Sequence, residues 1–146
     1  MKLYAFPLSG NAQKAIFLLA ELGLDYELVH VPPARPRPDW YLAINPLSGV
    51  PTLEDGDLVL PESNAILRYL AARERRDDLY PADLKARARV DCLLDVVSMT
   101  LRPPSFKLEV TAAGMTPGVG FDPAKVDPEK VRETVDEVRP ALESVI

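Results

Sequence analysis

Apolar residues near the start of the chain alternate between strand-like and helix-like spacing. Lys2–Phe6 is a short apolar run bounded by Pro7, which predicts a β-strand. Apolar residues at positions 12, 15, 16, 19 and 22 then recur at helical spacing, and Gly23 follows where a helix would end. Tyr26–His30 predicts a second strand. A strand, a helix and a strand with short connections form a βαβ unit, so we expect parallel strands and a right-handed crossover.

The next segment combines a proline-rich stretch with a hairpin and a helix. Prolines at positions 32, 33, 36 and 38 exclude a regular helix or a central strand, and Asp39–Ala43 is expected to form one helical turn. Asp55-Gly56-Asp57 separates two short apolar runs, 51–54 and 58–60, which predicts a β-hairpin. Ser63 is then the expected N-cap of a helix. The order βαβ, hairpin, helix is typical of a thioredoxin-like α/β domain, which we place at residues 1–73.

The second half of the chain has the pattern of an all-α domain. Residues 74–82 form a predicted linker, and Asp83 is expected to cap the next helix. Pro103-Pro104 is expected to end or sharply kink that helix, and the glycines and prolines of 112–128 predict a mobile loop. Apolar residues at 131, 135, 138, 142 and 145 share one helical face. We therefore expect a partial helical domain at 83–146 whose apolar stripe is covered by further helices or by another chain, and a frayed tail is the alternative.

Composition and charge exclude several classes of function. The chain has 146 residues, 22 acidic against 17 basic, and a net charge of −5, whereas a nucleic-acid-binding protein normally carries a basic face. No run approaches the roughly 18 apolar residues of a membrane span. Cys92 is the single cysteine, which excludes an internal disulfide and a metal site built from cysteines. We therefore expect a protein of a reducing, cytoplasmic compartment.

Two short motifs stand where a thioredoxin-like domain holds its ligand. Ser9 lies between the first strand and the first helix, where a hydroxyl can donate to a thiolate and lower its pKa. Val50-Pro51 enters the third strand, and a cis peptide bond there would present the Val50 backbone to an extended peptide. The alternatives stay open: Ser9 as a plain turn or capping serine, and Pro51 as an ordinary trans proline.

Charged and polar residues suggest binding of an amino acid and of a second carboxylate. Ser63 and the first free N–H groups of its helix form an anion site, and Glu62 is placed to take an ammonium group. Together they suit the head group of an α-amino acid. Arg35 and Arg37, in the proline-rich stretch, are candidates for a second carboxylate. Helix capping by Glu62-Ser63 and solvation of the two arginines are the structural alternatives.

The order and spacing of these motifs resemble those of one enzyme family. The run from 45 to 70, NPLSGVPTLEDGDLVLPESNAILRYL, closely resembles the N-terminal domain of glutathione S-transferases, as does Ser9 ahead of the first helix. Leu79–Asp83 and Ala86–Asp91 resemble the start of the helical domain of the serine-type, theta-like members. Ala141-Leu142-Glu143 resembles a later helix of that domain.

The resemblance implies a glutathione transferase that uses glutathione as co-substrate and no metal. It implies that Ser9 stabilises the glutathione thiolate and that Val50, before a cis Pro51, pairs with the cysteinyl backbone. It also implies that Glu62 and Ser63 hold the γ-glutamyl end. The thiolate would attack a small electrophilic substrate beside the helical domain. By the same resemblance the protein would be a cytoplasmic homodimer that serves detoxification.

Three departures from the family pattern bear on this hypothesis. Gly49 stands where family members often carry a basic residue, which weakens the expected grip on the glycyl carboxylate unless Arg35 or Arg37 substitutes. Ala5 stands at the position of the hydroxyl of tyrosine-type classes, which excludes that type, and Tyr4 is expected to face the other side of the strand. Later helices of the helical domain are missing. A non-catalytic binding or assembly module and a fragment of a longer enzyme are the alternative interpretations.

Overall fold

The computed structural model describes residues 1–116 and 120–143, and its contacts divide the chain into two units, Met1–Arg87 and Ala88–Ile146. The division falls within α4 (Leu84–Val96), shortly after residue 83, where we predicted that the helical domain starts. Ala86 N–H donates to the Asp83 carboxylate at 2.9 Å, which confirms the predicted cap of this helix. No described helix is both long and apolar enough to cross a membrane.

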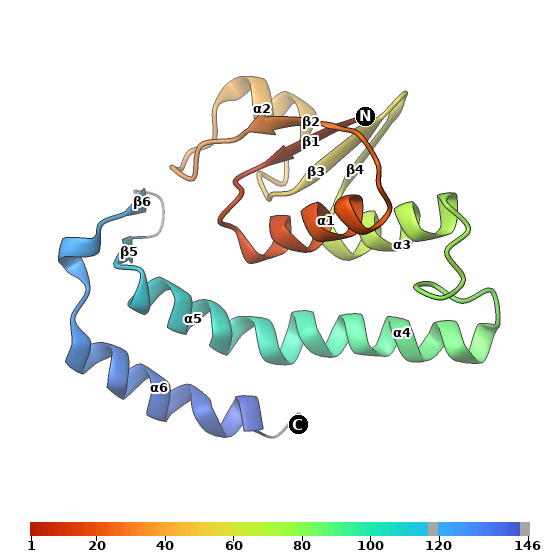
Figure 1. Ribbon diagram of the computed structural model, residues 1–146. Helices are drawn as coiled ribbons and strands as arrows, with labels where there is room; N and C mark the ends of the chain where they lie inside the picture. Colours follow the sequence, from red (N-terminus) through yellow and green to blue (C-terminus); the bar gives the residue numbers. More distant parts are fainter. Residues whose placement is uncertain (117–119, 144–146) are drawn as a thin grey trace. The chain divides into compact units, whose positions relative to one another are not determined.

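The first unit is a four-stranded sheet with helices on both faces (Figure 1). The strand order is β2-β1-β3-β4, in which β1 and β2 are parallel and the other two pairs are antiparallel. This is the predicted thioredoxin-like arrangement. Its elements in chain order are β1 (Lys2–Ala5), α1 (Gly10–Glu21), β2 (Glu27–His30), α2 (Asp39–Ile44), β3 (Thr52–Asp55), β4 (Leu58–Pro61) and α3 (Ser63–Arg73).

Successive residues of β1 enter two separate hydrophobic cores. Leu3 and Ala5 pack with buried residues of α1 and α3, whereas Tyr4 packs with Val31 and Tyr41. A β-strand turns successive side chains to opposite faces, so one short strand supports both layers of the domain. The expectation that Tyr4 faces the side opposite to Ala5 is confirmed. Figure 1 shows the same division, with α1 and α3 on one face of the sheet and α2 on the other.

The hairpin between β3 and β4 forms one residue later than the Asp-Gly pattern indicated. Asp55 pairs with Leu58, so the two-residue loop is Gly56-Asp57. Asp55 ends β3, and its carboxylate accepts hydrogen bonds from the Tyr69 hydroxyl at 2.7 Å and from Arg73 at 2.5 Å. These donors hold the pKa of the Asp55 carboxyl below its usual value. The two hydrogen bonds favour the shifted register because they keep Asp55 in the strand.

The second unit consists of helices and one short pair of strands. β5 and β6 pair antiparallel inside the segment predicted to be a mobile loop, of which residues 117–119 lie outside the described part. The predicted apolar face of the last helix is confirmed as far as Leu142, with Val138 buried, whereas Val145 lies outside the described residues. After α4, the elements are η1 (Val97–Leu101, a π-helix), α5 (Arg102–Ala112), β5 (Met115–Thr116), β6 (Gly120–Phe121), η2 (Pro123–Lys125) and α6 (Pro128–Glu143).

Pro103 and Pro104 do not end the helix, so the predicted helix end is wrong, whereas the alternative of a sharp kink stays a prediction. Both lie in the first turn of α5, directly after the π-helical segment η1. Arg102 N–H donates to the carbonyl of Val97, five residues back. The widened turn changes the hydrogen-bonding register just before the prolines, which have no N–H to donate. The chain therefore stays helical through both residues.

Candidate functional site

The sheet register brings three separate segments to one end of the first unit. Tyr4 of β1 pairs with Thr52 of β3, and Thr52 pairs with Pro61 of β4. Because β3 is antiparallel to both neighbours, the chain leaves β1, enters β3 and leaves β4 at the same end of the sheet. The parallel strand β2 also ends there. Every candidate residue lies in a segment next to this end: Ser9, Arg35, Arg37, Val50, Pro51, Glu62 and Ser63.

Ser9 occupies the N-cap position of α1, with φ −71° and ψ 122°. Its N–H donates to the Phe6 carbonyl, and its carbonyl accepts from Gln13 N–H, both at 2.9 Å. The backbone of Ser9 is therefore committed to the turn and to the helix. Its hydroxyl makes no capping hydrogen bond, although capping is the usual task of a serine at this position. This geometry leaves the hydroxyl able to donate to a ligand at the start of α1.

The peptide bond between Val50 and Pro51 is cis. Pro51 is buried, and Val50 is partly buried. The pairings of β3 with β1 and with β4 both begin at Thr52, so Val50 lies outside the two ladders. The Val50 backbone therefore extends the line of β3 without taking part in the sheet, which is how an extended peptide is bound as one more strand.

Glu62 and Ser63 form the start of α3. Glu62 is the N-cap residue and Ser63 the first helical residue, so the helix starts one position earlier than predicted. Glu62 has φ 72° and ψ 113°, a conformation that is rare for a residue with a side chain and is found preferentially at functional sites. Ser63 is 7% exposed, whereas Glu62 is exposed and makes no side-chain cap. A carboxylate and a helix N-terminus thus lie side by side, which suits an α-amino acid head group.

Arg35 and Arg37 hold the proline-rich segment against the turn that precedes β3. Arg35 donates to the Ser48 hydroxyl at 2.6 Å, and Arg37 donates to the Ser48 carbonyl at 3.3 Å and to the Pro32 carbonyl. Arg37 is only 8% exposed, and its burial, together with the charge of Arg35, lowers its pKa from the usual value. Neither arginine has a carboxylate among its described contacts. Two guanidinium groups without an anionic partner favour the binding of an anion at this corner.

Three buried polar residues at this end were not identified as site residues from the sequence. Tyr41, Asn45 and Thr52 are at most 3% exposed, and they form hydrogen bonds around the carbonyl of Gly49. Asn45 also accepts from Leu47 N–H at 3.0 Å, which is an Asx turn. The asparagine before Pro46 was the available local signal, because such residues initiate turns. The partners of this turn are not apparent from the linear sequence.

The described residues include no group of three or more His, Cys, Asp and Glu side chains that could hold a metal ion. The candidate site offers the hydroxyls of Ser9 and Ser63, backbone groups, one carboxylate and two guanidinium groups. Such a set binds a zwitterionic peptide through complementary charges at its two ends and through its backbone in the middle.

Comparison with known proteins identifies the family. A family model described as the glutathione S-transferase N-terminal domain matches residues 3–77, which is more than half of the chain. The chain belongs to the glutathione S-transferase family. Glutathione S-transferase 3 of Zea mays is 43% identical over 108 residues, which cover 70% of this chain and 48% of that protein. The chain spans about half the length of the curated plant transferases that it matches first.

Solved structures of glutathione S-transferases share the fold. Human glutathione S-transferase T1-1 in its apo form has a TM-score of 0.77 and 30% identity, covering 97% of this chain and 59% of that chain. The theta-class glutathione S-transferase of Xanthomonas axonopodis pv. citri, solved with glutathione bound, has a TM-score of 0.72 and 33% identity, covering 97% of this chain and 70% of that chain. The family resemblance seen in the sequence is confirmed, and theta-class members are among the structures that share it.

Proposed function

We propose that this chain binds glutathione at the end of the first sheet and activates its thiol for attack on a small electrophilic molecule. The observation that carries the proposal is that the sheet register brings the segments of Ser9, the cis Val50-Pro51 bond and Glu62-Ser63 to one end. Membership of the family supports it. So does the theta-class relative that was solved with glutathione bound, because that relative is 33% identical over nearly the whole of this chain.

Each part of glutathione has a matching group in the proposed site. The α-carboxylate of the γ-glutamyl end is bound by Ser63 and the N-terminus of α3, and its ammonium group is bound by Glu62. The cysteinyl backbone pairs with the N–H and C=O of Val50, as an added strand would. The glycyl carboxylate lies toward Arg35, whose guanidinium is the more exposed of the arginine pair, while buried Arg37 adds positive potential.

The reaction needs only a thiolate and a held electrophile. Glutathione releases its thiol proton to solvent, and the Ser9 hydroxyl donates a hydrogen bond to the sulfur, which lowers the pKa of the thiol. An electron pair of the thiolate then forms a carbon–sulfur bond, and in a substitution the leaving group departs with the bonding pair. Much of the remaining rate enhancement comes from holding the thiolate close to the electrophile.

Gly49 bears on a second candidate function. It stands where family members often carry a basic residue. This observation favours, as a second candidate, a binding or assembly module of the same fold that lacks the chemistry. For the catalytic form we propose, from the habit of the family, a cytoplasmic homodimer that serves detoxification.

Calorimetric titration of the purified 146-residue chain with reduced glutathione tests the proposal. We expect saturable binding to one site, after circular dichroism has shown that the chain is folded. S-methylglutathione is the matched control, because it keeps both carboxylates and the ammonium group but has no thiol to ionise. S-methylglutathione is also expected to bind. A folded chain that binds neither compound would contradict the proposed function and leave the module interpretation.

Gly49 provides a test of how the glycyl carboxylate is held. A Cβ at Gly49 would meet no atom within 4 Å, so a side chain can begin there without a clash at its first atom. We expect Gly49→Lys to bind glutathione roughly two- to fivefold more tightly, as an exposed ion pair would, with a gain that shrinks at high salt. Gly49→Ala is the control and is expected to match the parent in the same titration. Equal dissociation constants for the two variants at low salt would show that no carboxylate is bound beside Gly49.

A further inference from the structure

The carbonyl oxygen of Gly49 is held by two buried donors. The Tyr41 hydroxyl donates to it, and Asn45 Nδ2 donates to it at 3.0 Å. Tyr41 is fully buried, and Asn45 is 3% exposed. A carbonyl that accepts two hydrogen bonds from buried side chains has a strongly favoured direction, because turning it away would break both hydrogen bonds.

Counting protons shows that these groups form one directed network with Thr52. Asn45 Nδ2 also donates to Thr52 Oγ1 at 2.9 Å, and Thr52 Oγ1 lies 2.9 Å from the Tyr41 oxygen. Since Tyr41 uses its single proton on Gly49, the Thr52 hydroxyl must donate to Tyr41. Thr52 is the residue that pairs with β1 and β4, so the network ties the Gly49 carbonyl to the centre of the sheet.

The direction of the Gly49 carbonyl sets the direction of the next N–H group. Only the Arg35-Pro36 and Val50-Pro51 bonds are cis among the described residues, so the Gly49-Val50 peptide is trans. In a planar trans peptide the C=O and N–H groups point in opposite directions. The Val50 N–H therefore points away from the buried cluster of Tyr41, Asn45 and Thr52. This N–H is the group that the proposed function assigns to the ligand backbone.

We propose that Tyr41, Asn45 and Thr52 are positioning residues that aim the Val50 N–H at the cysteinyl carbonyl of glutathione. This inference rests on the proposed function and adds to it a buried network that does not touch the ligand. Its role differs from that of Ser9, because the network sets the affinity for the glutathione backbone and leaves the thiol untouched. Loss of one network hydroxyl thus weakens binding of glutathione without slowing the chemical step.

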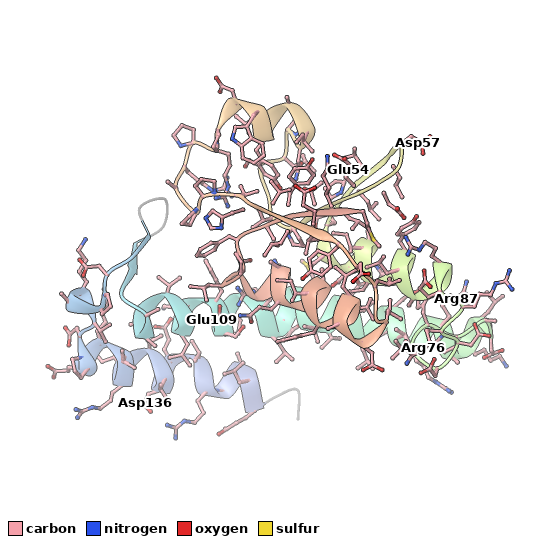
Figure 2. The ribbon with its side chains drawn as sticks, turned by 45° about the horizontal axis from the view of Figure 1, so that its top comes forward. Glu54, Asp57, Arg76, Arg87, Glu109 and Asp136 are labelled. Carbon is pink, nitrogen blue, oxygen red and sulfur yellow. The ribbon has the colours of Figure 1, made fainter. Side chains whose placement is uncertain are left out.

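The variant Tyr41→Phe removes one hydroxyl and keeps the buried ring, which packs against Tyr4 and Trp40. Tyr69→Phe is the matched control. It makes the same chemical change in the same unit, but its hydroxyl donates to Asp55 next to the hairpin, at the opposite end of the sheet. Figure 2 marks that end with the label of Asp57 at the hairpin loop. Thr52→Val is a second variant, which breaks the network at another member with nearly the same side-chain shape.

Two readouts separate positioning from a merely structural role. The first is the carbonyl carbon resonance of Gly49 in the free protein, which shifts when a hydrogen bond to that carbonyl is lost. The second is calorimetric affinity for glutathione, measured well below the unfolding midpoint of each variant. We expect Tyr41→Phe to move the Gly49 resonance and to weaken glutathione binding about 3- to 10-fold, the equivalent of one hydrogen bond. The KM for glutathione is expected to rise in parallel, while kcat and the KM for the electrophile stay within about twofold.

The outcomes distinguish this inference from the function on which it rests. A parent chain that binds no glutathione overturns the proposed function, and the positioning role with it. A parent that binds, together with a Tyr41→Phe variant that binds equally well, overturns the positioning role alone. An unmoved Gly49 resonance in both Tyr41→Phe and Thr52→Val overturns the network itself. Weaker binding in Tyr41→Phe but not in Tyr69→Phe, with a moved Gly49 resonance, supports the inference.

Discussion

Replacing Ser9 with alanine is expected to lower kcat/KM for conjugation roughly 10- to 100-fold near neutral pH, the effect of raising the thiol pKa by about one to two units. The Ser9 hydroxyl makes no capping hydrogen bond, so α1 loses no cap when this hydroxyl is removed. The bound thiol loses one donor and its pKa returns toward that of a free thiol. Glutathione binding, which depends on the other groups of the site, is expected to change little.

The pH profile of conjugation tests whether a raised thiol pKa causes the loss of activity. Activity follows the thiolate fraction, which rises as the pH passes the pKa of the bound thiol. Ser9→Ala raises that pKa, so its activity profile is expected to shift to higher pH and to approach the parent in alkaline solution. Ser9→Thr keeps a hydroxyl and is expected to retain most of the activity.

Ser105→Ala is the control for loss of a serine hydroxyl elsewhere in the chain. The Ser105 hydroxyl donates to the Arg102 carbonyl at 3.1 Å within α5, and its loss is expected to leave the pH profile unchanged. A Ser9→Ala protein that conjugates as fast as the parent at neutral pH would show that the thiolate role of Ser9 is wrong.

Replacing Gly114 with alanine is expected to destabilise the second unit by about 2–4 kcal/mol. Gly114 has φ 61°, which costs a residue with a side chain about 1 kcal/mol. The larger part of the lost stability comes from a steric clash. A Cβ at this position would overlap the backbone carbonyl oxygen of Asp122 and lie 3.1 Å from its carbonyl carbon. Asp122 N–H donates to the Gly114 carbonyl at 3.3 Å, so the two backbones cannot separate without losing this bond.

Gly23→Ala separates the cost of the backbone conformation from the cost of the steric clash. Gly23 has nearly the same conformation, φ 62°, but a Cβ there would meet no atom within 4 Å. It is expected to lose only about 1 kcal/mol, the backbone cost. Chemical denaturation gives the free energies of unfolding, and hydrogen exchange of the α5 and α6 amides localises the effect of Gly114→Ala. Equal losses in the two variants would show that the close approach of Gly114 and Asp122 does not contribute.

Short-range patterns were enough to predict most elements of the first unit. Alternation, helical spacing and turn residues act over a few neighbours, so β1, α1 and β2 begin and end within about two residues of the predicted bounds, and α3 starts one position from its predicted start. The errors arise where a longer-range interaction decides. Asp55 remained in β3 with its bonds to Tyr69 and Arg73, and the π-helical turn carried the helix through Pro103 and Pro104. In 112–128, pairing of β5 with β6 replaced the predicted loop.

For the candidate site, too, some properties were visible in the sequence and others depend on the fold. The chemistry of Ser9, Val50-Pro51 and Glu62-Ser63 was visible in the sequence because each motif lies next to the start of a predicted helix or strand. Their common location follows from the register of Tyr4, Thr52 and Pro61, which no single segment specifies. The hydrogen-bond partners of these residues depend most on contacts between distant parts of the chain.

The network around the Gly49 carbonyl illustrates this limit. Tyr41 and Thr52 are 11 positions apart in the chain, and they meet only because α2 packs against one face of the sheet. Residue identity and spacing predicted which groups could do the chemistry. Folding determined how those groups are aimed, because the direction of a backbone N–H depends on buried contacts that form only when the layers of the domain come together.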